Sequence, residues 1–280
     1  IAAGNFDVVF CAYSMQSIYR LKSPVPVVFT SDATPMTYKH SRIGQSFGSF
    51  LSISRLFDPL IQRAEKSALG DCDLLLWPTE WIKSCADSPY NLAPDRSIVV
   101  PWGANIQTPP REVNPPTLLP DAPVRLLFVG RDWFAKGGPT THQTLLHLRA
   151  KGVDARLTVI GCVPPQDTVT EGVTVHAELN KEIPEDLALF QNAFQSAHFM
   201  VMASMESFGF AFCEASAYGL PSLCLRVGGV PIRDGINGHA IAPENDDTRF
   251  SKIIQGYINN PDDYQTLRQT TREEFETRLN

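Results

Sequence analysis

The sequence predicts an α/β protein of two domains, each built around a parallel β-sheet. Short runs of β-branched and apolar residues alternate with amphipathic stretches, as in strand–helix–strand units. A segment with six prolines at residues 105–123 separates two such regions, in a chain of 280 residues. We read this segment as an exposed, stiff linker. The predicted domains are residues 1–115 and 116–280.

The first domain is predicted to contain four strands, at residues 7–13, 25–31, 73–79 and 97–103. A helix is predicted within residues 52–70, with Gly70 as its stop. Its apolar residues recur at helical spacing and are expected to pack against the sheet: Ile53, Leu56, Phe57, Leu60, Ile61 and Ala64.

The second domain repeats the alternation. Its predicted strands cover residues 124–130, 155–161, 198–204, 221–227 and 239–243, and its predicted helices 139–151, 185–195 and 209–218. Gly152 and Gly219 stand where helix C-caps favour a left-handed residue. Because ligands bind at the carboxyl ends of strands in such folds, we expect a site in a cleft between the domains.

Composition excludes several classes of function. The net charge of −6 argues against nucleic-acid binding through phosphate neutralisation. No apolar run is long enough to span a membrane, and no signal peptide is recognisable. The six cysteines have no metal-ligand or disulfide-like spacing, which is typical of reduced thiols. We therefore expect a cytoplasmic protein without a bound metal.

The stretch "MESFGFAFCEASAYGLPS" at residues 205–222 places Glu206 and Glu214 in apolar sequence. A helix is predicted to begin near Gly209, and the amides of Phe208, Gly209 and Phe210 are positioned to hold a phosphate or diphosphate. The two acids would then hydrogen-bond an elongated, hydroxyl-rich ligand. The alternative is structural: Glu206 is a capping-type acid near the start of the helix, and Glu214 is a paired acid of the core.

Two further loops follow predicted strands. Arg131 and Lys136 lie in "LLFVGRDWFAKGG", where both could neutralise a diphosphate. This loop is neither a Walker A motif nor a G-x-G-x-x-G loop, and solvated surface cations are the alternative. Gly228 and Gly229 follow another strand directly, where backbone can approach a ligand closely.

Together these residues resemble the retaining GT-B glycosyltransferases of the GT4 type, the glycosyl transferases group 1 family. Glu206 to Glu214 is similar to the family's E-x7-E pattern. The stretches "VGRDWFAKGG" and "CEASAYGLPSLCLRVGGVP" look like its diphosphate loop and the segment around its second glutamate. In the first domain, "DLLLWPTEWIKS" and "SIVVPWGAN" resemble the end of its acceptor domain.

The resemblance implies a GT-B fold of two Rossmann-like domains facing a cleft, and transfer of a sugar from a nucleotide-diphosphate sugar to an unidentified acceptor. Arg131 and Lys136 would stabilise the departing diphosphate, with the amides of Phe208 and Gly209. Glu206 would bind hydroxyls of the transferred sugar and Glu214 those of the ribose. Neither a metal nor a cofactor other than this co-substrate is implied.

The sequence also departs from the family pattern. Where members often carry a histidine after a first-domain strand, this chain has Ser31 and Asp32. Asp32 could contact sugar or acceptor, and an Asx-turn is equally compatible. The elements that open the first domain and the helix that closes the fold are not recognisable, so we expect a fragment with an incomplete first domain.

Other readings stay open at this point. A GT-B-type nucleotide-sugar epimerase would need acid and base groups flanking the sugar, and only the two glutamates are offered. A non-catalytic nucleotide-sugar binding module is the other alternative. Peripheral membrane contact is also open, because Arg55, Arg63 and Lys66 add modest positive charge to the acceptor side.

Overall fold

The computed structural model describes residues 5–42, 55–106, 109–111, 113, 116–119, 122–244 and 248–280. Ile53 and seven residues of the predicted linker lie outside the described residues. Contacts divide the chain into two compact units. Unit 1 is Ile1–Trp102 with Glu206–Gly209 and Val227–Val230, and unit 2 is Gly103–Met205, Phe210–Arg226 and Pro231–Asn280.

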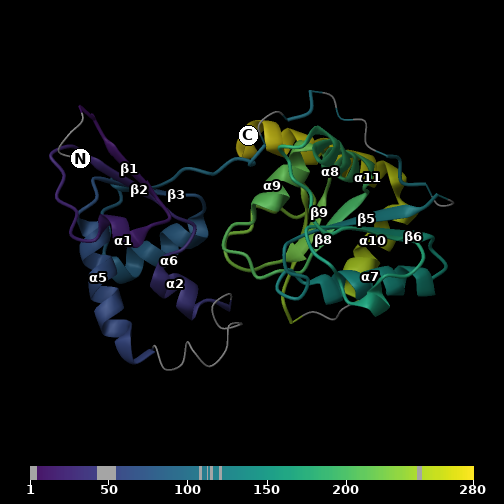
Figure 1. The fold of residues 1–280 in the computed structure, drawn as a ribbon, viewed down its shortest axis with the longest axis horizontal. Helices are drawn as coiled ribbons and strands as arrows, with labels where there is room; N and C mark the ends of the chain where they lie inside the picture. Colours follow the sequence, from purple (N-terminus) through teal and green to yellow (C-terminus); the bar gives the residue numbers. More distant parts are fainter. Residues whose placement is uncertain are drawn as a thin grey trace. The chain divides into compact units, whose positions relative to one another are not determined.

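Unit 1 contains a parallel sheet with the strand order β1-β2-β3-β4. Figure 1 labels β1, β2 and β3 of this sheet. Its strands are β1 (Val9–Ala12), β2 (Val27–Thr30), β3 (Leu74–Trp77) and β4 (Ser97–Val99). Each lies inside one of the four predicted runs, and Phe29 pairs in register with Leu75, both fully buried. Apolar runs of this kind predict strands well because a parallel sheet is buried on at least one face along its whole length.

The helical elements of unit 1 are α1 (Met15–Ile18), α2 (Pro35–His40), η1 (Arg55–Phe57), α5 (Asp58–Gly70) and α6 (Glu80–Tyr90). Their ends follow from local chemistry. The Thr79 side chain accepts the backbone N–H of Ile82 at the start of α6. Asn91 ends that helix in the left-handed conformation, with φ of 54°.

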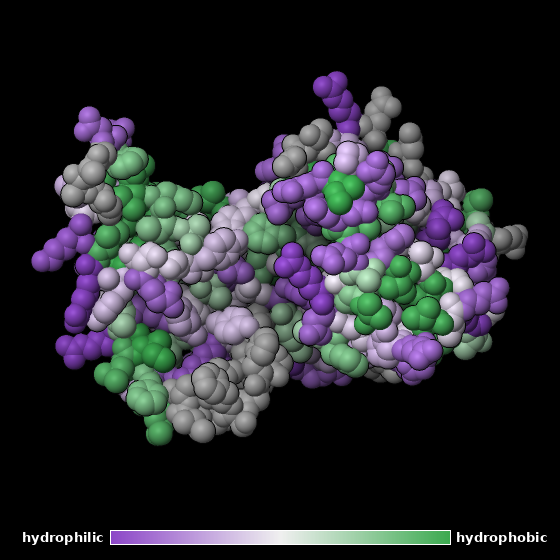
Figure 2. All heavy atoms as spheres, viewed as in Figure 1, coloured by the Kyte–Doolittle hydropathy of each residue, from purple (hydrophilic) through white to green (hydrophobic). Residues whose placement is uncertain are grey.

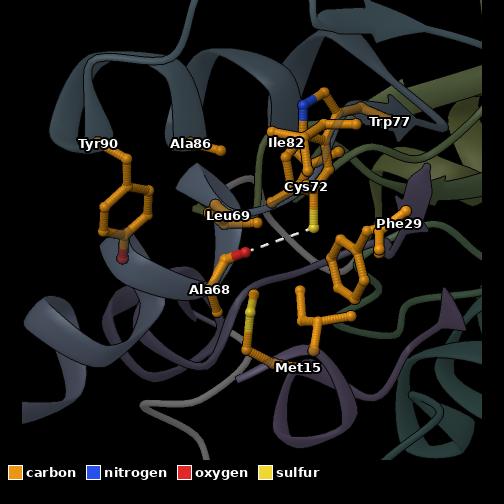
Figure 3. Packing of buried hydrophobic residues seen from close by; sticks show 12 residues of the cluster. Met15, Phe29, Ala68, Leu69, Cys72, Trp77, Ile82, Ala86 and Tyr90 are labelled. Carbon is orange, nitrogen blue, oxygen red and sulfur yellow. Dashed lines mark hydrogen bonds between the residues drawn. The ribbon is translucent and has the colours of Figure 1, made fainter. Parts of the chain in front are cut away.

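The core of unit 1 lies between the sheet and these helices. Figure 3 shows Phe29 and Trp77 of the strands beside Leu69 of α5 and Ile82 of α6, all fully buried. The indole N–H of Trp77 donates to the Ser97 hydroxyl at 2.8 Å, so this buried polar group is satisfied.

The prediction that the apolar residues of the helix within residues 52–70 pack against the sheet is partly wrong. Leu56, Phe57 and Leu60 are 81%, 56% and 66% exposed, and hydrophobic residues cover the surface at the start of α5 (Figure 2). The helix starts only at Asp58, and its buried side is formed by Glu65, Ala68 and Leu69. Gly70 is its last residue and not a stop beyond it.

An acid occupies that buried side because neighbouring donors satisfy it. Glu65 is 2% exposed and accepts the backbone N–H of Met36 at 2.8 Å and the hydroxyl of Tyr90. Burial raises the pKa of the Glu65 carboxyl, and these hydrogen bonds oppose the rise. The apolar periodicity of the sequence could not reveal this arrangement.

Unit 2 contains a parallel sheet of six strands in the order β10-β9-β8-β5-β6-β7. The strands are β5 (Val124–Val129), β6 (Ala155–Ile160), β7 (Val173–His176), β8 (Phe199–Met202), β9 (Ser222–Leu225) and β10 (Gly238–Ile241). Five of them coincide with predicted strands. The sixth, β7, was not predicted, because it is short and has no fully buried residue.

The helical elements of unit 2 lie on both faces of its sheet (Figure 1). They are α7 (Gly138–Ala150), η2 (Gln166–Thr168), α8 (Pro184–Ser196), α9 (Phe210–Ala217), α10 (Arg249–Asn259), α11 (Pro261–Glu274) and η3 (Phe275–Leu279). The three predicted helices are confirmed as α7, α8 and α9. Gly152 and Gly219 have φ of 81° and 57°, as predicted for C-cap positions.

Two expectations from composition can also be compared with the fold. All six cysteines are free thiols. Among the described residues, none of the helices is both long enough and apolar enough to pass through a bilayer.

Candidate functional site

The loop between β5 and α7 carries Arg131 and Lys136. The Asp132 side chain accepts the backbone N–H of Ala135 at 2.8 Å, and the Asp132 carbonyl accepts that of Lys136 at 3.1 Å. Trp133 is buried, with its ring 5.0 Å from that of Phe128. The loop backbone is thus fixed from within, while Arg131 is exposed and Lys136 is half-buried.

This loop lies directly against the segment that follows β8. Gly137 has φ of 77°, and a Cβ placed on it would lie 2.5 Å from the carbonyl carbon of Ala203. Such a distance is too short for any side chain, so glycine is needed for both the φ angle and the approach. The loop with the two cations and the chain leading to Glu206 therefore meet at one edge of the sheet of unit 2.

Helix α9 begins at Phe210, three residues after Ser207. Gly209 immediately before it has φ of 93°, which a glycine adopts without strain. The N-terminus of α9 carries a partial positive charge and faces the carboxyl edge of the sheet, since α9 follows β8. The predicted turn from strand to helix is confirmed.

Glu214 lies in the second turn of α9 and is 7% exposed. Its Oε1 atom accepts a hydrogen bond from Nζ of Lys181 at 3.0 Å. Burial raises the pKa of the Glu214 carboxyl, and Lys181 opposes the rise through its charge and its hydrogen bond. Glu214 is thus paired, as one of the two sequence-based alternatives expected, and the partner is a lysine that sequence reasoning missed.

The Lys181 side chain forms part of the wall of a pocket of about 350 Å³. Its ammonium group lies 4.0 Å from the centre of the Phe190 ring. Burial and the nearby Glu214 carboxylate raise the pKa of Tyr218, another wall residue, to about 12. The pocket is lined by Asn105, Ile106, Lys181, Glu182, Leu187, Phe190, Gln191 and Tyr218.

The remaining predicted residues belong to unit 1. Phe208 is buried, and its ring lies 5.4 Å from that of Trp102. Gly228 has φ of 58°, and a Cβ on it would lie 2.1 Å from the Glu206 carbonyl oxygen. Gly229 donates its N–H to the Ser207 carbonyl at 2.8 Å. The two glycines thus pack against the backbone of the Glu206 segment.

Asp32 accepts a hydrogen bond from the hydroxyl of Ser207. No hydrogen bond in the described part of the chain joins its carboxylate to backbone, so the Asx-turn alternative is wrong. Ser31 forms the local turn instead, donating its hydroxyl to the Ala33 carbonyl at 2.7 Å. Ser207 was missed as a partner, although it stands between two predicted site residues.

The structure therefore gathers the predicted residues in two groups. Unit 2 holds Arg131, Lys136, Phe210 and Glu214. Unit 1 holds Asp32, Glu206, Phe208, Gly209, Gly228 and Gly229. Among the described residues, no cluster of three or more His, Cys, Asp or Glu side chains is arranged to hold a metal ion. The catalytic and binding roles of all these residues stay predictions.

Comparison with known proteins places this geometry in a family. Residues 123–260, which include the Arg131 loop, β8 and α9, match the family described as Glycosyl transferases group 1. These residues belong to that family.

Two curated relatives, both D-inositol 3-phosphate glycosyltransferases, share parts of the chain. The protein of Streptomyces coelicolor is 38% identical over 72 residues, which are 25% of this chain and 16% of that protein. The protein of Corynebacterium kroppenstedtii is 27% identical over 153 residues, which are 49% of this chain and 33% of that protein. The matches thus span a third or less of the relatives' own length.

Solved structures show a similar fold at low identity. HepE of Anabaena in complex with UDP is 14% identical, with a TM-score of 0.70 over 98% of this chain and 75% of that one. WaaG, a glycosyltransferase involved in lipopolysaccharide biosynthesis, is 19% identical, with a TM-score of 0.62 over 90% of this chain and 74% of that one. The predicted α/β fold of the GT-B type is confirmed.

Proposed function

We propose that the protein is a retaining glycosyltransferase that moves a sugar from a nucleotide-diphosphate sugar to an acceptor hydroxyl. The contact between Gly137 and Ala203 carries this proposal, because it brings the loop of Arg131 and Lys136 to the segment that starts α9. Family membership and fold agree with it. A relative of similar fold, HepE, has been solved with UDP-glucose.

In the proposed reaction, the bond between the anomeric carbon and the β-phosphate oxygen breaks, and negative charge develops on the departing diphosphate. Arg131 and Lys136 would stabilise that charge, together with the backbone amides of Phe208, Gly209 and Phe210. The acceptor hydroxyl attacks the anomeric carbon from the face that the diphosphate leaves, and its proton passes to a phosphate oxygen. These positive groups are proposed to stabilise the departing diphosphate without a metal ion.

The other predicted residues would bind the sugars. Glu206 would accept hydrogen bonds from hydroxyls of the transferred sugar, and Asp32 would contact that sugar or the acceptor. Gly228 and Gly229 would let the backbone approach the donor. Glu214 would bind the ribose hydroxyls. Its Oε2 atom has no hydrogen-bond partner in the described part of the chain, whereas Oε1 is paired with Lys181.

Donor binding is the direct test. Calorimetry with UDP, GDP and ADP should find one diphosphate that binds the protein, and Lys136→Ala and Glu214→Ala should each weaken it by about tenfold or more. Lys151→Ala is a matched control, because Lys151 is exposed and follows α7 at the opposite edge of the sheet. The site assignment fails if both site variants bind as tightly as the wild type.

Product analysis separates the three readings of the sequence. The protein is incubated with the nucleotide-sugar of the diphosphate that it binds, with and without acceptor sugars, and the products are followed by proton NMR. A retaining glycosyltransferase should give a transferred or released sugar with the donor's anomeric configuration. Epimerised donor without any acceptor would favour the epimerase. An unchanged donor under all conditions would favour a binding module.

A further inference from the structure

We propose that Lys181 is a positioning residue that gives the donor site its preference for a ribose over a deoxyribose. It holds Glu214 as an oriented carboxylate, with Oε1 on the ammonium group and Oε2 left for the ribose hydroxyls. This inference rests on the proposed function, because it takes Glu214 as the ribose-binding acid.

The two carboxylate oxygens of Glu214 differ in their hydrogen-bond partners. Oε1 accepts from Lys181 Nζ at 3.0 Å, and Oε2 has no hydrogen-bond partner among the described residues. The charge-assisted hydrogen bond thus occupies Oε1, and Oε2 is the oxygen left to accept from a ligand. A ribose hydroxyl pair needs such an acceptor, because both hydroxyls can donate to it.

Lys181 is itself held in place. Asn180 Oδ1 accepts the N–H of Glu182 at 3.0 Å, and Asp186 accepts the N–H of Asn180 at 2.9 Å, which fixes the chain on both sides of Lys181. The Lys181 ammonium also lies 4.0 Å from the centre of the Phe190 ring. The backbone around Lys181 is therefore held by its neighbours, and its half-exposed ammonium group is positioned by Glu214 and the Phe190 ring.

The pair also bears on the charge of this buried acid, because Lys181 opposes the effect of burial on the pKa of the Glu214 carboxyl. Glu214 is 7% exposed, and burial alone would favour its neutral form. Lys181 supplies the positive charge that acts on it, while the Tyr218 hydroxyl nearby is neutral because its own pKa is raised. Without Lys181, the carboxyl would bind a proton more readily and become a donor on one oxygen, which fits a diol less well.

The experiment uses three ligands. They are whichever of UDP, GDP and ADP binds the wild type most tightly, the 2′,3′-dideoxy analogue of that nucleotide, and inorganic pyrophosphate. Calorimetry should show that Lys181→Met weakens the ribonucleotide by about tenfold. The dideoxy analogue and pyrophosphate should bind this variant as they bind the wild type, which also shows that the variant is folded. Lys181→Arg should restore most of the affinity.

A double-mutant cycle makes the test specific to the pair. In a Glu214→Gln background, Lys181→Met should cause no further loss of ribonucleotide affinity. The inference alone fails if Lys181→Met binds the ribonucleotide as the wild type does, or loses the same factor for the dideoxy analogue. If none of the three diphosphates binds the wild type, the proposed function fails and the inference fails with it.

Discussion

Gly137 packs its backbone against that of Ala203, at a distance that leaves no room for a Cβ atom. This contact joins the end of the loop that carries Arg131 and Lys136 to the segment after β8. Two segments more than sixty residues apart in sequence are thereby held at one edge of the sheet of unit 2. The proposed site depends on that approach.

Gly137→Ala should therefore damage both stability and donor binding. The left-handed φ of 77° and the contact with Ala203 both disfavour alanine, and together they should cost about 3 kcal/mol of unfolding free energy. Because the loop must move away, affinity for the donor diphosphate should fall as well. Urea denaturation and calorimetry measure the two effects.

Gly152→Ala provides the matched control for that variant. Gly152 has a similar φ of 81°, but a Cβ on it would meet nothing within 4 Å. It should cost only about 1 kcal/mol, with donor affinity unchanged. Equal losses in the two variants would show that the contact with Ala203 does not matter.

His198 should make the protein less stable in mild acid. It is 1% exposed, its Nδ1 accepts the Arg125 N–H at 3.0 Å, and its Nε2 lies 3.2 Å from the Thr117 carbonyl. Burial lowers the pKa of this histidine from 6.5 to about 4, although the hydrogen bond to Thr117 opposes the change. A proton on Nδ1 would also face the Arg125 donor, so the folded state keeps the ring neutral.

The sign of the pH effect follows from this lowered pKa. Between pH 6.5 and about 4 the unfolded chain binds a proton at His198 that the folded chain does not, so stability falls as pH falls. The loss should approach roughly 3 kcal/mol at the acid end. His198→Gln should flatten this part of the profile, measured by urea denaturation at several pH values. His176→Gln, on β7, should leave it unchanged, and equal slopes for the wild type and His198→Gln would contradict the prediction.

Arg268 of α11 should be a large contributor to the stability of unit 2. Arg268 is 2% exposed. Its guanidinium donates to the Ala197 carbonyl at 3.0 Å and the Tyr218 carbonyl at 3.3 Å, just beyond the ends of α8 and α9. Cations there satisfy free carbonyls and the negative end of the helix dipole. It has no carboxylate partner in the described part of the chain.

Arg268→Met should therefore cost about 3 kcal/mol of unfolding free energy, because it leaves two buried carbonyls without donors. Arg156→Met is the control, since Arg156 is exposed and paired only with the exposed Asp154. That change should stay within about 0.5 kcal/mol. A small loss for Arg268→Met in denaturant titrations would contradict the assignment.

Much of this fold could be predicted from local sequence, because its strands are apolar runs between turn residues. The turn at Gly209 and the C-cap glycines were also predictable, since positive φ angles need glycine. The face of α5 was not, because Glu65 is buried through Tyr90 and Met36, which are remote in sequence. Helix α11 is too polar to produce a periodic apolar signal.

The candidate site shows the same limit. Its motif residues were predicted because they lie in loops that follow strands or, like Glu214, on the helix after such a loop. Lys181 was missed because it pairs with Glu214 across thirty-three positions. No local pattern encodes such a pair. Asp32 was placed correctly in a loop after β2, but its bond to Ser207 spans 175 positions and only the fold reveals it.

The most direct test of the central claim is a crystal structure of the protein with the nucleoside diphosphate that it binds most tightly. The proposal predicts diphosphate oxygens within hydrogen-bond distance of Arg131, Lys136 and the amide of Phe210, with the ribose at Glu214. A diphosphate bound elsewhere on the protein, with Arg131 and Lys136 in solvent, would contradict it.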